Sequence, residues 1–222
     1  MKKLLLIAAA TAALSTSAMA DDMGMAGSFY LRGDLSTMKF QNFTDKDTNL
    51  KVKSKWNAGL DLGVGYNVMD NVRSELVWVH AFNPEAKKAG TSSYGTQVRV
   101  KHKGTADAIM LKGAVDVADL GMAQLFVDGG LGWGIIKEKI TWTDSTVSAN
   151  SGSVTSKKAN TLAWTLGVGG GFDVADGVRL DLQYAYTDFG KTKSAKITGY
   201  NPELAKDRYR AHAIKFGVRF DI

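Results

Sequence analysis

The sequence predicts an all-β fold, namely an eight-stranded, antiparallel, up-and-down transmembrane β-barrel. Three observations lead to this prediction. Apolar and polar side chains alternate with a period of two through much of the chain, which is the pattern of strands and not of helices. No segment after residue 20 approaches the about 20 apolar residues of a transmembrane helix, so only a barrel could cross a membrane. Short turns alternate with long polar segments, as in up-and-down barrels.

The first 20 residues have the three regions of a secretory signal peptide. Two lysines follow Met1, an apolar run occupies residues 4–13, and an A-x-A cleavage motif ends at Ala20. The apolar run is too short for a membrane anchor. We therefore predict that residues 1–20 are a cleaved signal peptide and that residues 21–222 form the barrel domain.

The chain ends in a regular strand, residues 211–222. Every second position counted back from the last residue is apolar, and this row consists of Ile214, Phe216, Val218, Phe220 and Ile222. The pattern resembles the C-terminal recognition signal of bacterial outer-membrane β-barrels, which usually ends in Phe. The resemblance implies that the five residues contact the barrel assembly machinery. The same strand should pair with the first strand, so that the sheet has no free edge.

Seven further strands are expected before this one. They lie at residues 28–40, 56–68, 72–78, 108–117, 123–135, 162–174 and 178–187. In the second of these, Trp56 and Tyr66 share a face ten residues apart. At a rise of roughly 3.3 Å per residue and a tilt near 40°, this spacing spans about 25 Å, the height of the apolar band between two aromatic girdles.

Three connections are short and four are long, which predicts short periplasmic turns and long extracellular loops. The short turns are residues 69–71, 118–121 and 175–177, and the long segments are residues 41–55, 83–103, 137–160 and 191–210. In two long segments the alternation continues out of phase with the neighbouring strand. Bulges near Gly104 and Lys137 would let these strands continue above the membrane, and ten strands is the alternative count.

The inward-facing positions carry nearly equal numbers of positive and negative charges. The six cations are Arg32, Arg73, Lys112, Arg179, Lys215 and Arg219, and the five anions are Asp34, Asp61, Glu75, Asp128 and Asp181. An eight-stranded barrel is only wide enough for side chains, so these charges should pair and fill it. The sequence therefore does not predict a porin.

The long segments are basic, and the second and fourth have the largest excess of Lys and Arg. The opposite rim is acidic, with Asp70, Asp116, Asp119, Asp173, Asp176 and Asp221. One interpretation is that the cations contact lipopolysaccharide phosphates. The other is a docking surface for an acidic partner, because aromatic residues beside cations are typical of interfaces. The candidate binding residues are Lys87, Lys88, Lys101, Lys103, Lys193, Lys196, Tyr200, Arg208 and Tyr209.

Catalysis has little support in the sequence, and we expect no catalytic residue, metal site, cofactor or nucleic-acid ligand. The chain has no cysteine and only three histidines, too few for a metal cluster. The glycines of GVGGGF are not followed by the helix that nucleotide binding requires. The remaining alternative is a lipid-modifying or proteolytic barrel in which His80 or His212 activates Ser92 or Ser93.

Several stretches resemble the Adr-type surface adhesins of rickettsiae, within the Opa/OmpX/Ail-like eight-stranded β-barrels. These are GYNVMDNVRSEL at 65–76, IKEKI at 136–140, VRLDLQYAYTDFGKTK at 178–193 and HAIKFGVRFDI at 212–222. The resemblance implies a protein of the bacterial outer membrane with loops exposed at the cell surface. It also implies binding to a host serum or matrix protein, such as vitronectin. The alternatives are a structural outer-membrane protein, a small channel or a barrel enzyme.

Overall fold

The computed structural model describes residues 26–222, except residues 42, 45–50, 92–96, 145–151, 157 and 193–207. The predicted signal peptide and its cleavage site at Ala20 lie outside the described residues. Within the described part, no helix is long and apolar enough to cross a membrane.

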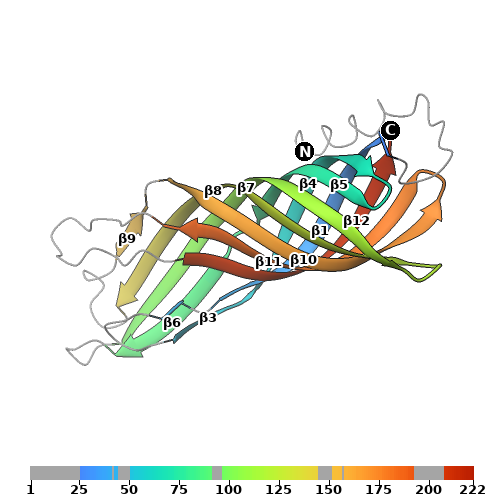
Figure 1. Cartoon of the computed structure of the whole chain (residues 1–222). Coiled ribbons are helices and arrows are strands. Elements are labelled where there is room, and N and C mark those ends of the chain that lie inside the picture. The colour runs from blue at the N-terminus through green and yellow to red at the C-terminus, as the bar shows by residue number, and fades with distance from the viewer. Residues whose placement is uncertain are drawn as a thin grey trace, which may run out of the picture.

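Eight antiparallel strands close into a barrel, as predicted (Figure 1). They are β1 (Phe29–Phe40), β4 (Trp56–Met69), β5 (Val72–Ala81), β7 (Gln97–Asp119), β8 (Gln124–Asp144), β10 (Ala159–Ala175), β11 (Val178–Lys191) and β12 (Arg208–Asp221). Their order is β7-β5-β4-β1-β12-β11-β10-β8, and pairing of β7 with β8 closes the ring. The C-terminal strand β12 pairs with β1, with Phe216 opposite Leu35. No edge therefore remains in the barrel.

Four short strands extend the sheet beyond the barrel at the end opposite to the C-terminus (Figure 1). They are β2 (Phe43–Thr44), β3 (Lys51–Ser54), β6 (Glu85–Thr91) and β9 (Gly152–Thr155). The first three add to β7 in the order β2-β3-β6, and β9 adds to β8. The long strands β7 and β8 thus run through the barrel wall and continue into this extension. The predicted continuation of the strands is confirmed.

The bulges expected near Gly104 and Lys137 do not occur. The pairing of β7 with β8 runs without a shift from Val98 opposite Asp144 to Asp116 opposite Phe126. The apolar residues change phase for a different reason. The inward positions of β7 and β8 next to these segments are already apolar, with Met110 and Ile136 buried, so the phase of the apolar residues changes along unbroken strands. The register shifts instead lie beside the three short turns and at residues 188–190 of β11.

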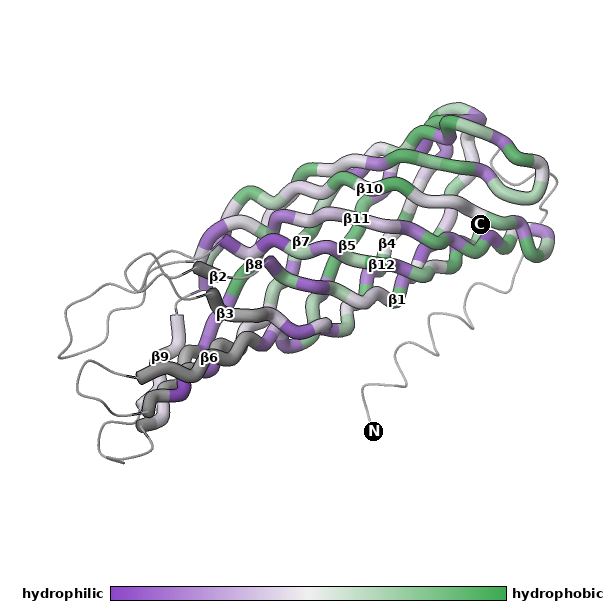
Figure 2. The backbone as a smooth tube through the Cα atoms, turned by 90° about the horizontal axis from the view of Figure 1, so that it is seen from below, coloured by the Kyte–Doolittle hydropathy of each residue, from purple (hydrophilic) through white to green (hydrophobic). Residues whose placement is uncertain are grey.

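The outer wall of the barrel is apolar. Hydrophobic and hydrophilic residues alternate along the strands (Figure 2), and large apolar side chains such as Leu35 and Leu131 point outward. Trp56 and Tyr66 are both exposed on the outside, as their spacing predicted. Such a surface is stable only in contact with lipid, because a soluble protein rarely exposes so large an apolar area.

The interior has two layers of different chemistry. The layer nearer the short turns is polar and contains the predicted charges. The layer nearer the extension is apolar, and consists of Met38, Phe40, Val77, Val79, Met110, Ile136, Phe189 and Tyr209 with several alanines. Phe40 stacks on Phe189 at 6.0 Å and meets the Tyr209 ring edge-on at 5.8 Å. The barrel is thus filled by paired charges near the short turns and by close-packed apolar side chains near the extension.

Candidate functional site

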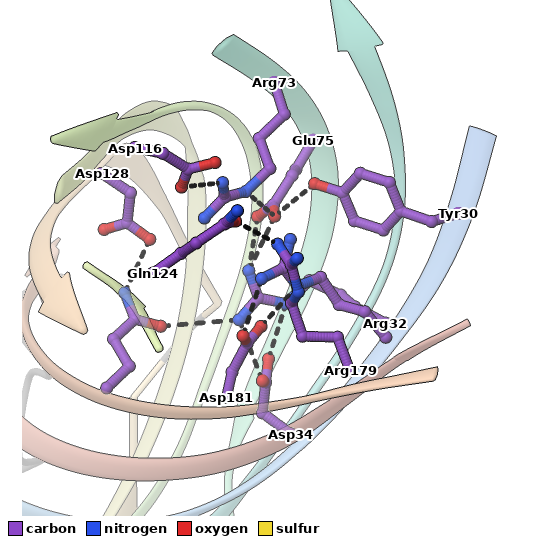
Figure 3. A network of polar contacts seen from close by, with 12 residues as sticks. Tyr30, Arg32, Asp34, Arg73, Glu75, Asp116, Gln124, Asp128, Arg179 and Asp181 are labelled. Carbon is purple, nitrogen blue, oxygen red and sulfur yellow. Dashed lines mark hydrogen bonds and ion pairs between the residues drawn. The ribbon is translucent and has the colours of Figure 1, made fainter. Parts of the chain in front are cut away.

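Glu75 is the centre of the polar layer (Figure 3). Its carboxylate is buried and accepts hydrogen bonds from Nη1 of Arg32 at 2.8 and 2.7 Å and from the Tyr30 hydroxyl at 2.7 Å. Lys112 Nζ lies 3.5 Å away, and Nε of Arg73 lies 3.8 Å away. A single carboxylate therefore holds together side chains from β1, β5 and β7.

Further ion pairs surround this centre, and all six predicted cations and all five predicted anions are buried. The pairs are Arg32 with Asp34, Lys112 with Asp128, Lys215 with Asp61, and Arg219 with Asp181. Gln183 also donates a hydrogen bond to Asp128 at 2.6 Å. Removing one partner of such a pair typically costs about 3 to 5 kcal/mol, because the other charge remains buried without compensation. The prediction of a charge-filled interior is confirmed.

The network ends in a small cavity at the short-turn end of the barrel. The cavity has a volume of about 30 Å³ and is lined by residues that include Tyr30, Arg73 and Arg179. Arg73 pairs with Asp116, and Arg179 pairs with Asp173, so part of the acidic rim neutralises interior arginines. A space of this size is on the scale of a single water molecule, about 30 Å³ in the liquid. It is too small to bind an organic ligand.

The basic end of the molecule is the extension, and it carries the candidate residues of the second long segment. Lys101 and Lys103 lie on β7, where Lys103 is exposed and Lys101 forms an ion pair of 3.5 Å with Glu85. Lys87 and Lys88 lie on β6, opposite Lys101 and Val100. The structure therefore brings Lys87, Lys101 and Lys103 together on neighbouring strands.

Two lysines of the third long segment, which are not among the predicted binding residues, lie on this same surface. Lys139 lies directly opposite Lys103, and Lys137 lies opposite Thr105. Both lysines are exposed, whereas Glu138 between them is buried. The alternation of cations at 101 and 103 and at 137 and 139 was visible in the sequence. The register that brings these lysines together across β7 and β8 could not be read from the sequence.

Of the fourth long segment, the structure describes residues 191, 192 and 208–210. Arg208 and Arg210 both lie on the buried carboxylate of Asp188, at 2.7 and 3.2 Å. Much of the charge of Arg208 is therefore neutralised within the protein. Lys193, Lys196 and Tyr200 lie outside the described residues.

Tyr209 was expected on the exposed binding surface, and this expectation is wrong. Its side chain is 2% exposed and packs against Phe40 inside the barrel. The reason is the alternation of β12, in which Tyr209 shares the inward positions of Ala211 and Ala213, both of them buried. The sequence contained this signal, because the strand pattern continues back from residue 222 without interruption.

Two histidines lie on the outer wall, where the enzyme alternative would need them. His80 Nδ1 is 2.6 Å from Asp107 Oδ1 and stacks on Trp78, and His212 Nδ1 is 2.6 Å from the Tyr184 hydroxyl. Neither of these contacts is with a serine hydroxyl, and Ser92 and Ser93 lie outside the described residues. In the part of the chain that the structure describes, no group of three His, Cys, Asp or Glu side chains could hold a metal ion.

Comparison with known proteins agrees with this architecture. The family model described as "Outer membrane protein beta-barrel domain" matches residues 6–221. A protein of Rickettsia massiliae (strain Mtu5) named "Putative adhesin" is 34% identical over 229 residues, which cover 100% of both chains. A protein of Rickettsia prowazekii (strain Madrid E), also named as a putative adhesin, is 34% identical over 228 residues and is likewise covered completely.

Solved structures of low sequence identity share the fold. OprG from Pseudomonas aeruginosa has a TM-score of 0.53 at 15% identity and covers 90% of this chain and 99% of its own. Neisserial surface protein A has a TM-score of 0.50 at 14% identity and covers 87% and 97%. The chain belongs to the family of the outer membrane protein β-barrel domain, and within it to the group that contains the rickettsial proteins named as adhesins.

Proposed function

We propose that this outer-membrane β-barrel is a surface adhesin that binds a host serum or matrix protein through basic extracellular loops. The observation that carries the proposal is the contrast between the two parts of the molecule. Among the described residues, buried side chains fill the interior, and the cavity at its short-turn end has a volume of only about 30 Å³, whereas the extension presents exposed lysines. The names of the rickettsial relatives support the same function. Vitronectin is the ligand that the resemblance suggests.

The proposal includes an orientation and a processing step. The short turns face the periplasm, and the extension faces the cell exterior, where its cations also meet lipopolysaccharide. The signal peptide is removed after Ala20. The outward row Ile214, Phe216, Val218, Phe220 and Ile222 on β12 engages the barrel assembly machinery during insertion. This orientation is supported by the unequal lengths of the connections at the two ends.

Neither catalysis nor transport is part of the proposed function. The histidine contacts lack a nucleophile among the described residues, and the two filled layers oppose passage through the barrel. The second candidate is a structural barrel without a specific ligand. It is favoured by the density of buried ion pairs, which by themselves serve only to fill and rigidify the barrel.

Surface display separates the two candidates. The full chain is expressed in a non-adherent bacterium, and its outer-membrane assembly is checked by the shift in gel mobility on heating. Cells that display the chain should bind immobilised vitronectin or another serum or matrix protein, whereas cells that display an unrelated eight-stranded barrel should not. Equal binding by both cell types, at equal levels of displayed barrel, would favour the structural role and refute the adhesin.

A further inference from the structure

The ends of β11 and β12 next to the extension lean over the lumen and close it. Tyr209 of β12 reaches across the barrel to β7, because a Cβ at Gly104 would lie 3.1 Å from the Tyr209 hydroxyl. In the ring of strands, three strands separate β12 from β7 on either side. The backbone of Phe189 on β11 occupies the space that a side chain at Gly134 of β8 would need, although β10 lies between these two strands. We name residues 188–192 and 208–211 the lid.

A β-bulge lets β11 turn inward at this point. The register of β11 against β12 shifts between Asp188 and Gly190, so Phe189 is the extra residue. Gly190 has a φ of +98°, a conformation that residues with a side chain rarely adopt. Phe189 is fully buried and stacks on Phe40 in the apolar layer. The bulge therefore places an aromatic side chain of the lid inside the lumen.

One carboxylate holds the two halves of the lid together. Oδ1 of Asp188 accepts a hydrogen bond from the Gly190 amide at 2.9 Å. The Nε atoms of Arg208 and Arg210 lie 2.7 and 3.2 Å from its Oδ2 atom. Because Asp188 belongs to β11 and the two arginines belong to β12, these ion pairs join both halves. We name Asp188, Arg208 and Arg210 the latch.

The latch is open to solvent on one side only. The Asp188 side chain is 1% exposed, whereas the Arg208 and Arg210 side chains are 42% and 36% exposed. A carboxylate that approaches from outside can form the same charge-assisted hydrogen bonds with the guanidinium groups as Asp188 does. If it draws the arginines away, Asp188 becomes a buried carboxylate without cations, which is strongly unfavourable. Movement of Asp188 into solvent relieves this state and pulls the adjacent Phe189 out of the apolar layer.

We propose that the lid opens when an acidic partner takes Arg208 and Arg210 from Asp188. Opening exposes the apolar layer to the cell exterior, while the ion pairs of the polar layer stay in place and keep the barrel closed. The inference rests on the proposed function in one respect, because it requires this end of the barrel to face outward and to meet an acidic protein. It adds a conformational response to binding, in which Asp188 occupies the place of the partner's carboxylate until the partner arrives.

Single cysteines can report the position of the lid, since the chain contains none. Ala106→Cys places a thiol in the apolar layer, two residues from Gly104 on β7. Ala114→Cys is the matched control on the same strand, where Ala114 lies opposite Asp128 of the polar layer. Both alanines are buried. Each mature chain is folded into phosphatidylcholine vesicles, folding is checked by the shift in gel mobility on heating, and the rate of labelling by a water-soluble maleimide is measured.

The first comparison tests the latch with Asp188→Asn, which removes the negative charge and keeps an oxygen for the Gly190 amide. Labelling at position 106 should become about tenfold faster or more, as expected for the loss of charge-assisted hydrogen bonds. Labelling at position 114 should stay within about twofold of its original rate, because the opening is local. An unchanged rate at position 106 would overturn the proposal. Equal acceleration at both positions would also overturn it, because the substitution would then loosen the whole barrel.

The second comparison tests the response to a partner and needs no change in the latch. Poly-L-glutamate is the acidic probe, and poly-L-lysine of equal length is the blank. The probe should accelerate labelling at position 106 by at least about fivefold, the lower end of typical coupling between two sites. It should not affect position 114. An unchanged rate at position 106, or the same acceleration by the blank, would contradict the opening of the lid by an acidic partner.

A variant of the two arginines shows whether the probe acts through the latch. In Arg208→Gln/Arg210→Gln, labelling at position 106 should be fast without poly-L-glutamate and should not respond to it. The control Lys103→Gln/Lys139→Gln removes two exposed cations of β7 and β8 and should keep the wild-type response. A full response in the arginine variant would contradict the proposal, as would loss of the response in the lysine control.

The outcome is separable from that of the adhesin test. Opening of the lid by poly-L-glutamate, without binding of host protein by displaying cells, contradicts the adhesin function and leaves the latch in place. Binding of host protein without any response to poly-L-glutamate contradicts the latch alone.

Discussion

At the scale of single residues, glycines decide how the interior packs. Gly65 lies opposite Tyr30 on the neighbouring strand, and the Tyr30 ring occupies the space that a side chain at Gly65 would need. Phe126 lies over Gly169 in the same way. Gly65 thereby supports the polar network. With its ring lying over Gly65, Tyr30 donates a hydrogen bond from its hydroxyl to Glu75 at 2.7 Å.

We predict that Gly65→Ala destabilises the barrel. The new Cβ would lie 2.1 Å from the Tyr30 ring, so the ring must move and its hydrogen bond to Glu75 must break. Overpacking of this kind typically costs about 1 to 3 kcal/mol. The measurement is the midpoint of urea unfolding in lipid vesicles. Gly113→Ala is the control, because a Cβ there meets nothing within 4 Å. If both variants unfold at the same urea concentration, the packing of Tyr30 over Gly65 is not a structural requirement.

At the scale of elements, β12 has two functions in one strand. Its inward side contributes Lys215 and Arg219 to the ion-pair network. Its outward side presents Phe216 and Phe220 to lipid. Because the strand also closes the barrel against β1, assembly and stability depend on the same strand, through residues on its two sides. The resemblance to the C-terminal recognition signal concerns only the outward row.

We predict that Phe216→Ser/Phe220→Ser abolishes insertion but leaves export intact. The terminal row would lose both aromatic side chains that resemble the insertion signal. The control is Leu166→Ser/Phe172→Ser on β10, which also removes two exposed apolar side chains from the lipid-facing wall. The readout is the amount of heat-modifiable barrel in outer-membrane fractions. Equal losses in the two variants would mean that the loss of lipid contact in general explains the effect. If the Phe216→Ser/Phe220→Ser variant still assembles in the outer membrane, the terminal row is not a recognition signal.

The same scale shows what the sequence could predict. Period-two alternation identified the barrel strands and the charges of the polar layer, because polar and apolar environments lie on opposite sides of one wall, but it did not include the buried Glu138 and Asp188. The apolar upper interior was not predicted, although Met38 and Val77 continue the inward phase of Asp34 and Glu75 on the same strands. Tyr209 was assigned by composition instead of strand phase, and was misplaced. The meeting of Lys103 with Lys139 depends on cross-strand register, which no single strand pattern contains.

At the scale of the whole molecule, the barrel is a filled support for the surface at its extended end. The polar layer is connected through Glu75, and the apolar layer above it is packed around Phe40. A rigid wall of this kind holds β7 and β8 in register well beyond the apolar band. Under the proposed function, ligand binding therefore takes place on the outer face and the loops and not in the lumen.

We predict that planar bilayers containing the folded chain show no stable large conductance. The two layers close the lumen, and the cavity at the short-turn end is only about 30 Å³. Single-channel recording is the measurement, with a porin of known conductance reconstituted in parallel to show that insertion is detectable. A persistent current of porin size would contradict the filled interior.

The central claim is that basic residues at the extended end recruit an acidic host protein. The most direct test is the association rate of vitronectin with the vesicle-bound chain and with a Lys87→Gln/Lys88→Gln/Lys193→Gln/Lys196→Gln variant, over a series of salt concentrations. Charges at an interface act mainly on association and are screened over about 8 to 10 Å at physiological salt. The wild-type rate should exceed that of the variant about tenfold at low salt, and the difference should vanish at high salt. Arginine at the same four positions should preserve the wild-type rate. A correctly folded glutamine variant with the same rate and the same salt dependence as wild type would contradict the claim.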